Sequence, residues 1–327
     1  SEVHDHVHEE ESWASLRVKA LESLLVEKGL ISSDSVDGLV EAYEQDIGPL
    51  NGAKVVARAW VDPEYKRRLL ENGTEAIAEA AKLLSLAKFP VILAGAGVVI
   101  GGAIADCAAL AERLEAPVCN GYQHNDSFPG SHPLACGPLG YNGSKAAMEL
   151  IAQADVVLAL GTRLNPFSTL PGYGIDYWPQ KADIIQVDFN SDRIGLTKKV
   201  SVGICGDAKL VAQQLLEQLS TTAGDEGRDE RKAIIHQTKS AWLQTLTSLD
   251  HEEDDPGTTW NADSRARDAD LMSPRQAWRA IQEGLPREAI ISSDIGNNCA
   301  IGNAYPTFEA GRKYMSPGLF GPCGYGF

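Results

Sequence analysis

The sequence lacks the features that mark several classes of protein. It has no long uninterrupted apolar run: residues 89–105, the most apolar stretch, are broken by glycines and are typical of strand, turn and helix, not of a membrane span. Basic residues are scarce, 29 against 45 acidic ones, and the net charge of −16 argues against nucleic acid and membranes as partners. The first 14 residues have no basic start or apolar core, so they do not form a secretory signal. We expect a cytoplasmic protein.

Clustered metal ligands are also missing. None of the six cysteines belongs to a Cys-x-x-Cys pair, and their spacing is wide and irregular. Such residues are expected to be small, mostly buried thiols in a reducing compartment. His4, His6 and His8 lie in a charged N-terminal segment, where a solvated tail is favoured over a metal site.

A chain of 327 residues with 43% hydrophobic content is long enough for about two domains. Residues 1–76 have apolar residues at helical spacing, and four helices of this size bury little surface by themselves. We therefore expect an all-helical arm that packs on a partner. A central domain over 77–220, a helix and linker over 221–270, and an incomplete α/β unit over 271–327 should follow.

From about residue 79 strand and helix patterns alternate, which predicts an α/β fold with a doubly wound, mostly parallel, Rossmann-like sheet. The expected strands cover residues 89–93, 117–120, 156–160, 184–187, 200–204 and 289–293. The expected helices cover residues 104–114, 146–152, 208–219, 232–249 and 273–283.

A glycine-rich loop at residues 95–102 follows the first of these strands and precedes a helix, as a dinucleotide fingerprint does. Its spacing, Gly-x-Gly-x-x-x-Gly, has one residue too many. Asp188 ends a later strand, and Arg163 follows another, where it could meet an anionic group or pair with Asp188. A nicotinamide or flavin site remains open, but we expect a structural turn without a nucleotide.

The last 15 residues predict a strand that runs into a second glycine-rich turn, with glycines at 318, 321, 324 and 326. Such a turn at the start of a helix is a common site for a phosphorylated cofactor. The sequence stops where that helix should begin, so we expect an enzyme interrupted within its cofactor site.

Four segments resemble the sulfoacetaldehyde acetyltransferase family of thiamine-diphosphate enzymes, which act in taurine breakdown. They are residues 88–97, Gly-Tyr-Gln-His-Asn at 121–125, residues 161–178 and residues 192–199. The resemblance, over about 79–327, implies an acyltransferase that uses thiamine diphosphate and magnesium to convert sulfoacetaldehyde and phosphate to acetyl phosphate and sulfite.

The same resemblance implies which residues approach the cofactor, and it places no catalytic residue in this chain. The diphosphate approaches a first segment, which consists of Ile295, Gly296, Asn297 and Asn298. A second segment supports the bent cofactor and consists of Gly321, Pro322, Cys323 and Gly324. The family's pyrimidine-binding domain, with its activating glutamate, and its magnesium motif have no counterpart here. The chain is therefore expected to be inactive alone and to bind neither cofactor nor metal.

Residues 17–30 and 48–63 resemble the N-terminal helical arm of nitrile hydratase α subunits. That family holds its metal with a cysteine cluster that this chain lacks, so nitrile hydration is not implied. A fusion of two truncated genes, joined near residues 75–81, is the simplest explanation. A nitrile hydratase α-type fragment and a non-catalytic nucleotide- or partner-binding module remain alternatives, and the chain could form a homo-oligomer or dock a protein through its arm.

Overall fold

The computed structural model describes residues 23–24, 26–29, 32, 63–220, 223, 225, 227–249, 274–317 and 323–324. The chain divides into two compact units, Ser1–Arg68 and Leu69–Phe327. The prediction of a helical arm over 1–76 falls largely outside the described residues. The division of the chain into four parts stays a prediction.

Helix α4 (Pro63–Leu86) begins with a proline, which is favoured at the first position of a helix because the N–H that it lacks would have no partner there. It continues without a break past residue 76. Within the second unit its buried residues, Ile77, Ala80, Ala81 and Leu84, recur at intervals of three or four and belong to the main core.

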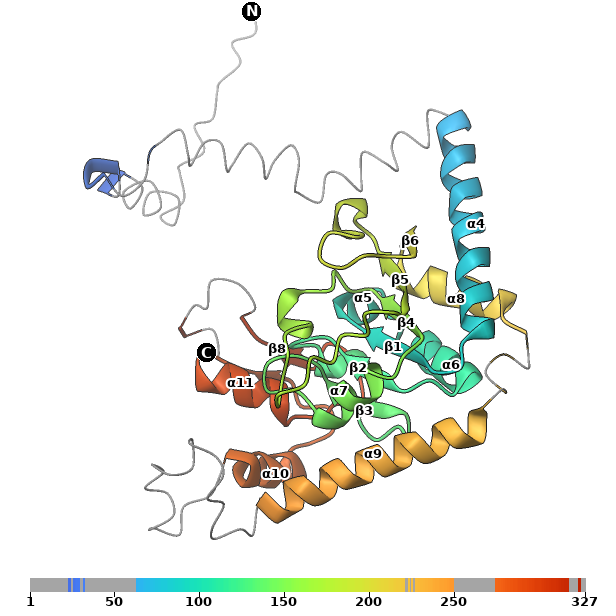
Figure 1. Cartoon of the computed structure of the whole chain (residues 1–327). Helices are drawn as coiled ribbons and strands as arrows, with labels where there is room; N and C mark the ends of the chain where they lie inside the picture. Colours follow the sequence, from blue (N-terminus) through green and yellow to red (C-terminus); the bar gives the residue numbers. More distant parts are fainter. Residues whose placement is uncertain are drawn as a thin grey trace, which may run out of the picture. The chain divides into compact units, whose positions relative to one another are not determined.

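The central sheet has six parallel strands in the order β3-β2-β1-β4-β5-β6 (Figure 1). The strands are β1 (Pro90–Ala94), β2 (Val118–Asn120), β3 (Ala135–Pro138), β4 (Val156–Leu160), β5 (Asp183–Asp188) and β6 (Val202–Cys205). Every residue of β1 and β4 is buried, as expected for strands covered on both faces. The predicted parallel α/β fold is confirmed.

Helices lie on both faces of this sheet. They are α5 (Ala96–Ile100), α6 (Ile104–Leu114), α7 (Lys145–Ile151) and α8 (Ala208–Gln218). Helix α6 packs on β1 and α8, whereas α7 packs on β2, β3 and α9 (Arg228–Leu249). The crossovers that contain α6 and α7 run in opposite directions across the sheet, so their shared right-handedness places the two helices on opposite faces.

The edge strand β3 was not predicted. Its sequence, Ala-Cys-Gly-Pro, carries no strand signal, and Gly137 has a φ of 89°. Proline cannot donate to a sheet ladder and is tolerated at an edge. The strand forms because β2 offers it a partner, with an irregularity between Val118 and Cys119.

After α9 the chain forms a smaller α/β element. It consists of α10 (Pro274–Gly284), β7 (Ile291–Ser292), α11 (Asn297–Ala304) and β8 (Tyr314–Met315), with β7 and β8 paired in parallel. The strands expected near 289–293 and at the start of the C-terminal segment are present but short. Helix α11 was missed because its sequence, Asn-Asn-Cys-Ala-Ile-Gly-Asn-Ala, has little apolar periodicity.

The six thiols are all free, and four are buried, as predicted: Cys107, Cys119, Cys136 and Cys299, against exposed Cys205 and Cys323. Burial raises the pKa of Cys107 and of Cys136 to about 12. Burial, and then Asp188, also raise the pKa of Cys205.

We expect a thiol-reactive chromophore to label two cysteines in the native chain and six in denaturant. The thiolate is the reacting form. The rate at which Cys205 is labelled should therefore rise with pH, and at pH 7 it should be lower than the rate for an ordinary thiol. Mass spectrometry of the labelled peptides identifies the sites; fast native labelling of Cys107 or Cys119 would contradict the buried core.

Candidate functional site

The glycine loop after β1 lies at the point where the strand order reverses, because β2 and β4 flank β1 on opposite sides. Open α/β sheets usually bind ligands at such a point. In this chain the backbone segments that follow β1 and β4 contact each other at this point. The Gly97 N–H donates to Gly161 O at 2.8 Å, and the Gly95 N–H donates to Leu160 O at 3.0 Å.

The glycines of this loop are required because the backbone after β4 packs directly against them. A Cβ on Gly97 would lie 2.6 Å from Gly161 Cα, and a Cβ on Gly95 would lie 2.5 Å from Thr162 Cβ. Gly161 has a φ of 61°, a conformation that favours glycine. The loop brings the ends of β1 and β4 together, and its helix, α5, has five residues. This geometry favours the structural interpretation over a dinucleotide site.

Arg163 and Asp188 lie near each other at the carboxyl ends of β4 and β5. Asp188 Oδ1 accepts a hydrogen bond from Asn190 N at 2.9 Å. Burial raises the pKa of the Asp188 carboxyl, and the Asn190 hydrogen bond and the charges of Arg193 and Arg163 oppose that rise. Among the described residues Arg163 and Asp188 form no ion pair within 4 Å, so both roles that the sequence left open for Arg163 stay predictions.

The segment expected to meet a diphosphate leads from β7 into α11. Ile295 is partly buried, whereas Gly296, Asn297 and Asn298 are exposed at the start of the helix. Gly296 caps α11 with a φ of 77°. Backbone N–H groups in the first turn of a helix have no partner within the helix, and the helix dipole favours an anion there. The local geometry is compatible with a phosphate group.

Asp294 joins this segment to the glycine-rich turn near the end of the sequence. Its Oδ1 accepts from Ile295 N at 2.8 Å, and its Oδ2 accepts from Gly324 N at 2.9 Å. The two segments that were expected to approach one cofactor are thus adjacent. Cys323 is exposed, while Gly321 and Pro322 lie outside the described residues.

The loop at residues 121–125 positions α11 against the central sheet. The Gln123 N–H donates to Asn303 Oδ1 at 2.8 Å, and Asn303 Nδ2 donates to Tyr141 O at 3.0 Å. Asn125 Nδ2 donates to both Asn303 O and Pro306 O at 2.9 Å. All three amide side chains are buried. This loop was recognised as family-like in the sequence, but its role in docking α11 was not.

A second set of contacts surrounds the Cys299 thiol on α11. Gln123 Nε2 donates to Cys299 Sγ and to Ser316 Oγ, and the Tyr122 hydroxyl lies 3.2 Å from the same sulfur. Burial and the neighbouring thiol raise the pKa of Tyr122, so it stays a neutral phenol. Asp126 Oδ2 in addition accepts from Lys313 N at 3.0 Å. Asp126, Asp294, Cys299 and Asn303 were not singled out from the sequence. The polar residues after β2 were the available signal, since strand ends are where such contacts gather.

The described part of the chain contains no group of three or more His, Cys, Asp or Glu residues placed to hold a metal ion. No helix within it is long and apolar enough to cross a membrane.

Residues 77–215, which contain all six strands of the sheet, match the family described as "Thiamine pyrophosphate enzyme, central domain". The match covers the parallel sheet and the glycine contact between β1 and β4.

Curated relatives match a longer stretch of the chain than the family model does. A "Probable sulfoacetaldehyde acetyltransferase" of Rhizobium meliloti (strain 1021) is 76% identical over 256 residues, which are 78% of this chain and 43% of the relative. A "Sulfoacetaldehyde acetyltransferase" of Roseovarius nubinhibens is 75% identical over 255 residues, 78% of this chain and 42% of the relative. A "Probable acetolactate synthase large subunit" of Methanocaldococcus jannaschii is 30% identical over 287 residues, 86% of this chain and 44% of the relative. This chain thus spans less than half the length of the curated relatives that it matches.

A second family, described as "Nitrile hydratase, alpha chain", matches residues 12–92. This match and that of the central domain share residues 77–92, which include the end of α4 and all of β1. The chain therefore combines parts similar to two families, as the sequence predicted.

Proposed function

We propose that residues 77–327 form the central domain and the first part of the diphosphate-binding domain of a sulfoacetaldehyde acetyltransferase. The observation that carries the proposal is the 76% identity over 256 residues with the Rhizobium meliloti relative. At 30% the similarity to an acetolactate synthase subunit is far lower. The proposed reaction converts sulfoacetaldehyde and phosphate to acetyl phosphate and sulfite.

The described residues fit the phosphate end of thiamine diphosphate in part. The exposed start of α11 presents Gly296, Asn297 and Asn298, and Asp294 holds Gly324 beside them. We assign the diphosphate approach to Ile295–Asn298 and support of the cofactor to the turn containing Cys323 and Gly324. When bound, thiamine diphosphate supplies the carbanion chemistry; these residues would hold and orient it.

The alternative functions receive less support. The nitrile hydratase match covers residues 12–92, but the sequence has no Cys-x-x-Cys pair that could serve as the metal cluster implied for that family. We propose only that this part docks on a protein partner or a second copy. Binding of a nucleotide by the central domain is disfavoured by the contact of Gly97 with Gly161.

We expect no sulfite release from the purified chain with sulfoacetaldehyde, phosphate, thiamine diphosphate and magnesium. The resemblance places the activating glutamate and the magnesium motif outside this sequence, and magnesium needs hard oxygen ligands. Calorimetric titration with thiamine diphosphate should show weak or no binding. Sulfite release by the chain, free of any full-length enzyme, would refute its inactivity.

A chimera tests the family assignment separately from that inactivity. The 256 aligned residues of the Rhizobium meliloti protein are replaced by those of this chain. We expect the chimera to release sulfite within about tenfold of the parent rate, since a similar fold and similar cofactor contacts should cost at most about 1.4 kcal/mol. A folded chimera that binds thiamine diphosphate yet releases no sulfite would show that the substrate is wrong.

A further inference from the structure

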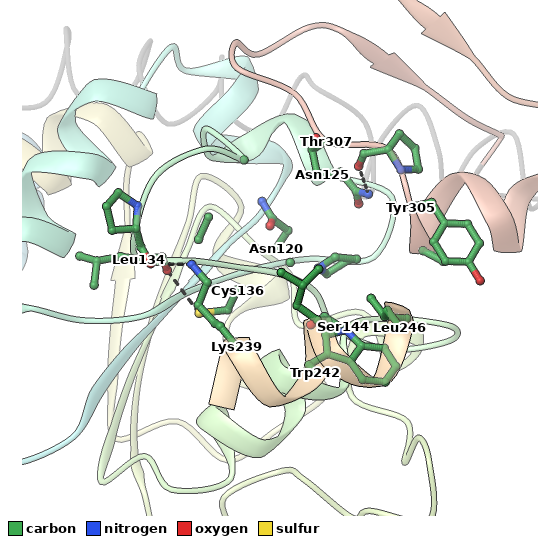
Figure 2. A pocket seen from close by; sticks show the side chains of 18 of the residues that line it. Asn120, Asn125, Leu134, Cys136, Ser144, Lys239, Trp242, Leu246, Tyr305 and Thr307 are labelled. Carbon is green, nitrogen blue, oxygen red and sulfur yellow. Dashed lines mark hydrogen bonds between the residues drawn. The ribbon is translucent and has the colours of Figure 1, made fainter. Parts of the chain in front are cut away.

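A pocket of about 860 Å³ lies at the edge of the central sheet, away from the segments assigned to the cofactor. It is bounded by β3, by α9 and α10, and by residues 304–307 at the end of α11 (Figure 2). None of Ile295–Asn298, Cys323 or Gly324 lines it. Pockets that hold small molecules commonly measure about 300–1,000 Å³. The size suits a small organic ligand.

One wall of the pocket is apolar and aromatic. Trp242 and Leu246 extend from α9, and Tyr305 also lines the pocket (Figure 2). Trp278 of α10 adds a second indole. The Trp242 ring is held in an edge contact with Tyr173, with ring centroids 5.5 Å apart. Partly exposed aromatic rings that are held in place offer a flat ligand contact area at low entropic cost.

The opposite wall is the edge strand. Within the described sheet β3 is paired on one side only, with β2, and residues 134–138 line the pocket in an unbroken run. An edge strand presents backbone N–H and C=O groups that can bond to something other than a strand. The pocket therefore combines an aromatic wall with a polar backbone wall.

The charges around the pocket favour an anion, although the whole chain has a net charge of −16. Four cationic side chains line it, Lys232, Lys239, Arg275 and Arg279, against two carboxylates, Glu115 and Glu283. Lys232 lies 3.6 Å from Glu115.

Lys239 is the cation best placed for a ligand. Its Nζ donates to Pro133 O at 2.6 Å, beside the Cys136 thiol (Figure 2). Among the described residues no carboxylate lies within 4 Å of it. A half-buried ammonium among apolar side chains gains stability from an anion that replaces lost water.

We propose that this pocket binds a small organic anion with a flat apolar body. The carboxylate or an equivalent anionic group pairs with Lys239, and the ring lies against Trp242 and Leu246. The site is separate from the proposed acetyltransferase function and does not depend on it.

Isothermal titration of the full chain with 2-naphthoate tests the proposal, with 2-naphthamide as the uncharged control. We expect 2-naphthoate to bind at least about tenfold more tightly than the amide, the usual size of one charge-assisted hydrogen bond. In Lys239→Gln that preference should vanish, whereas Trp242→Ala should weaken both ligands by a similar factor. Lys145→Gln is the matched control, because Lys145 is a partly exposed lysine of α7 that pairs with Glu149 outside the pocket.

Circular dichroism confirms that each variant is folded, and Lys239→Met replaces Lys239→Gln if the latter is not. Equal affinity of the wild-type chain for the two ligands would overturn the proposal. So would a preference for naphthoate that survives in both Lys239 variants, or the absence of any binding at millimolar concentrations.

Discussion

Replacement of Arg231 by methionine is expected to lower the free energy of unfolding of residues 69–327 by about 3 kcal/mol or more. The Arg231 side chain is 1% exposed. Its guanidinium donates to three backbone carbonyls, Lys88 O at 2.8 Å, Leu114 O at 3.0 Å and Glu115 O at 3.1 Å. Methionine fills a similar volume but leaves these oxygens without a donor, which is the costly outcome in a buried site.

The position of these carbonyls explains the size of the effect. Leu114 and Glu115 end helix α6, where the last carbonyls have no partner within the helix and the dipole favours a cation. Lys88 leads into β1. Arg231 thus ties α9 to the end of α6 and to the segment that leads into β1.

Thermal and urea unfolding measure the loss, which should lower the melting temperature by about 10 °C for a unit of this size. Arg231→Lys should retain part of the stability, because an ammonium reaches fewer acceptors than a guanidinium. Arg287→Met changes an exposed arginine after α10 and should have almost no effect. If Arg231→Met and Arg287→Met have the same melting temperature and the same urea midpoint, the proposed anchoring role of Arg231 is wrong.

The central domain was predictable because its strands are short, continuous apolar runs separated by helical patterns. The predicted limits of β4 and of α6 agree with the structure at both ends, since each segment is strongly patterned and bounded by polar or turn residues. β3 and α11 carry no such pattern. Each is held in place by contacts with residues far away in the sequence, β3 by β2 and α11 by the loop at 121–125.

The candidate site was only partly predictable for the same reason. Resemblance located the two segments near residues 295 and 324, and the structure adds Asp294, which connects them. A carboxylate that accepts a hydrogen bond from a backbone N–H 30 residues away leaves no local signal in the sequence. The pocket beside β3 could not be predicted either, because its walls come from parts of the chain that are far apart in the sequence.

Replacement of Gly97 by alanine is expected to cost about 3 kcal/mol of stability, at the upper end of what overpacking usually costs. The added methyl would lie 2.6 Å from Gly161 Cα and 3.0 Å from Gly161 O. Both contacts involve backbone, so no side-chain rotation relieves them. The ends of β1 and β4 would have to separate, and the 2.8 Å hydrogen bond from Gly97 N to Gly161 O would be strained or lost.

The same substitution at Gly73 is the matched control and should have the opposite sign. Gly73 lies within α4, where an added Cβ meets nothing within 4 Å. Alanine is favoured over glycine inside a helix by about 1 kcal/mol, so Gly73→Ala should stabilise the unit slightly. Thermal unfolding of the two variants beside the wild type provides the comparison.

Titration with NAD, FAD and ADP completes the test of the glycine loop. If Gly97 serves only the contact with Gly161, the wild-type chain should show no low-micromolar affinity for any of the three, because the N–H groups at the turn already donate to protein carbonyls. Gly97→Ala would then change stability alone. Low-micromolar binding of one of these nucleotides that is abolished in Gly97→Ala, under conditions where circular dichroism shows the variant folded, would instead assign the loop to a nucleotide and overturn its structural interpretation.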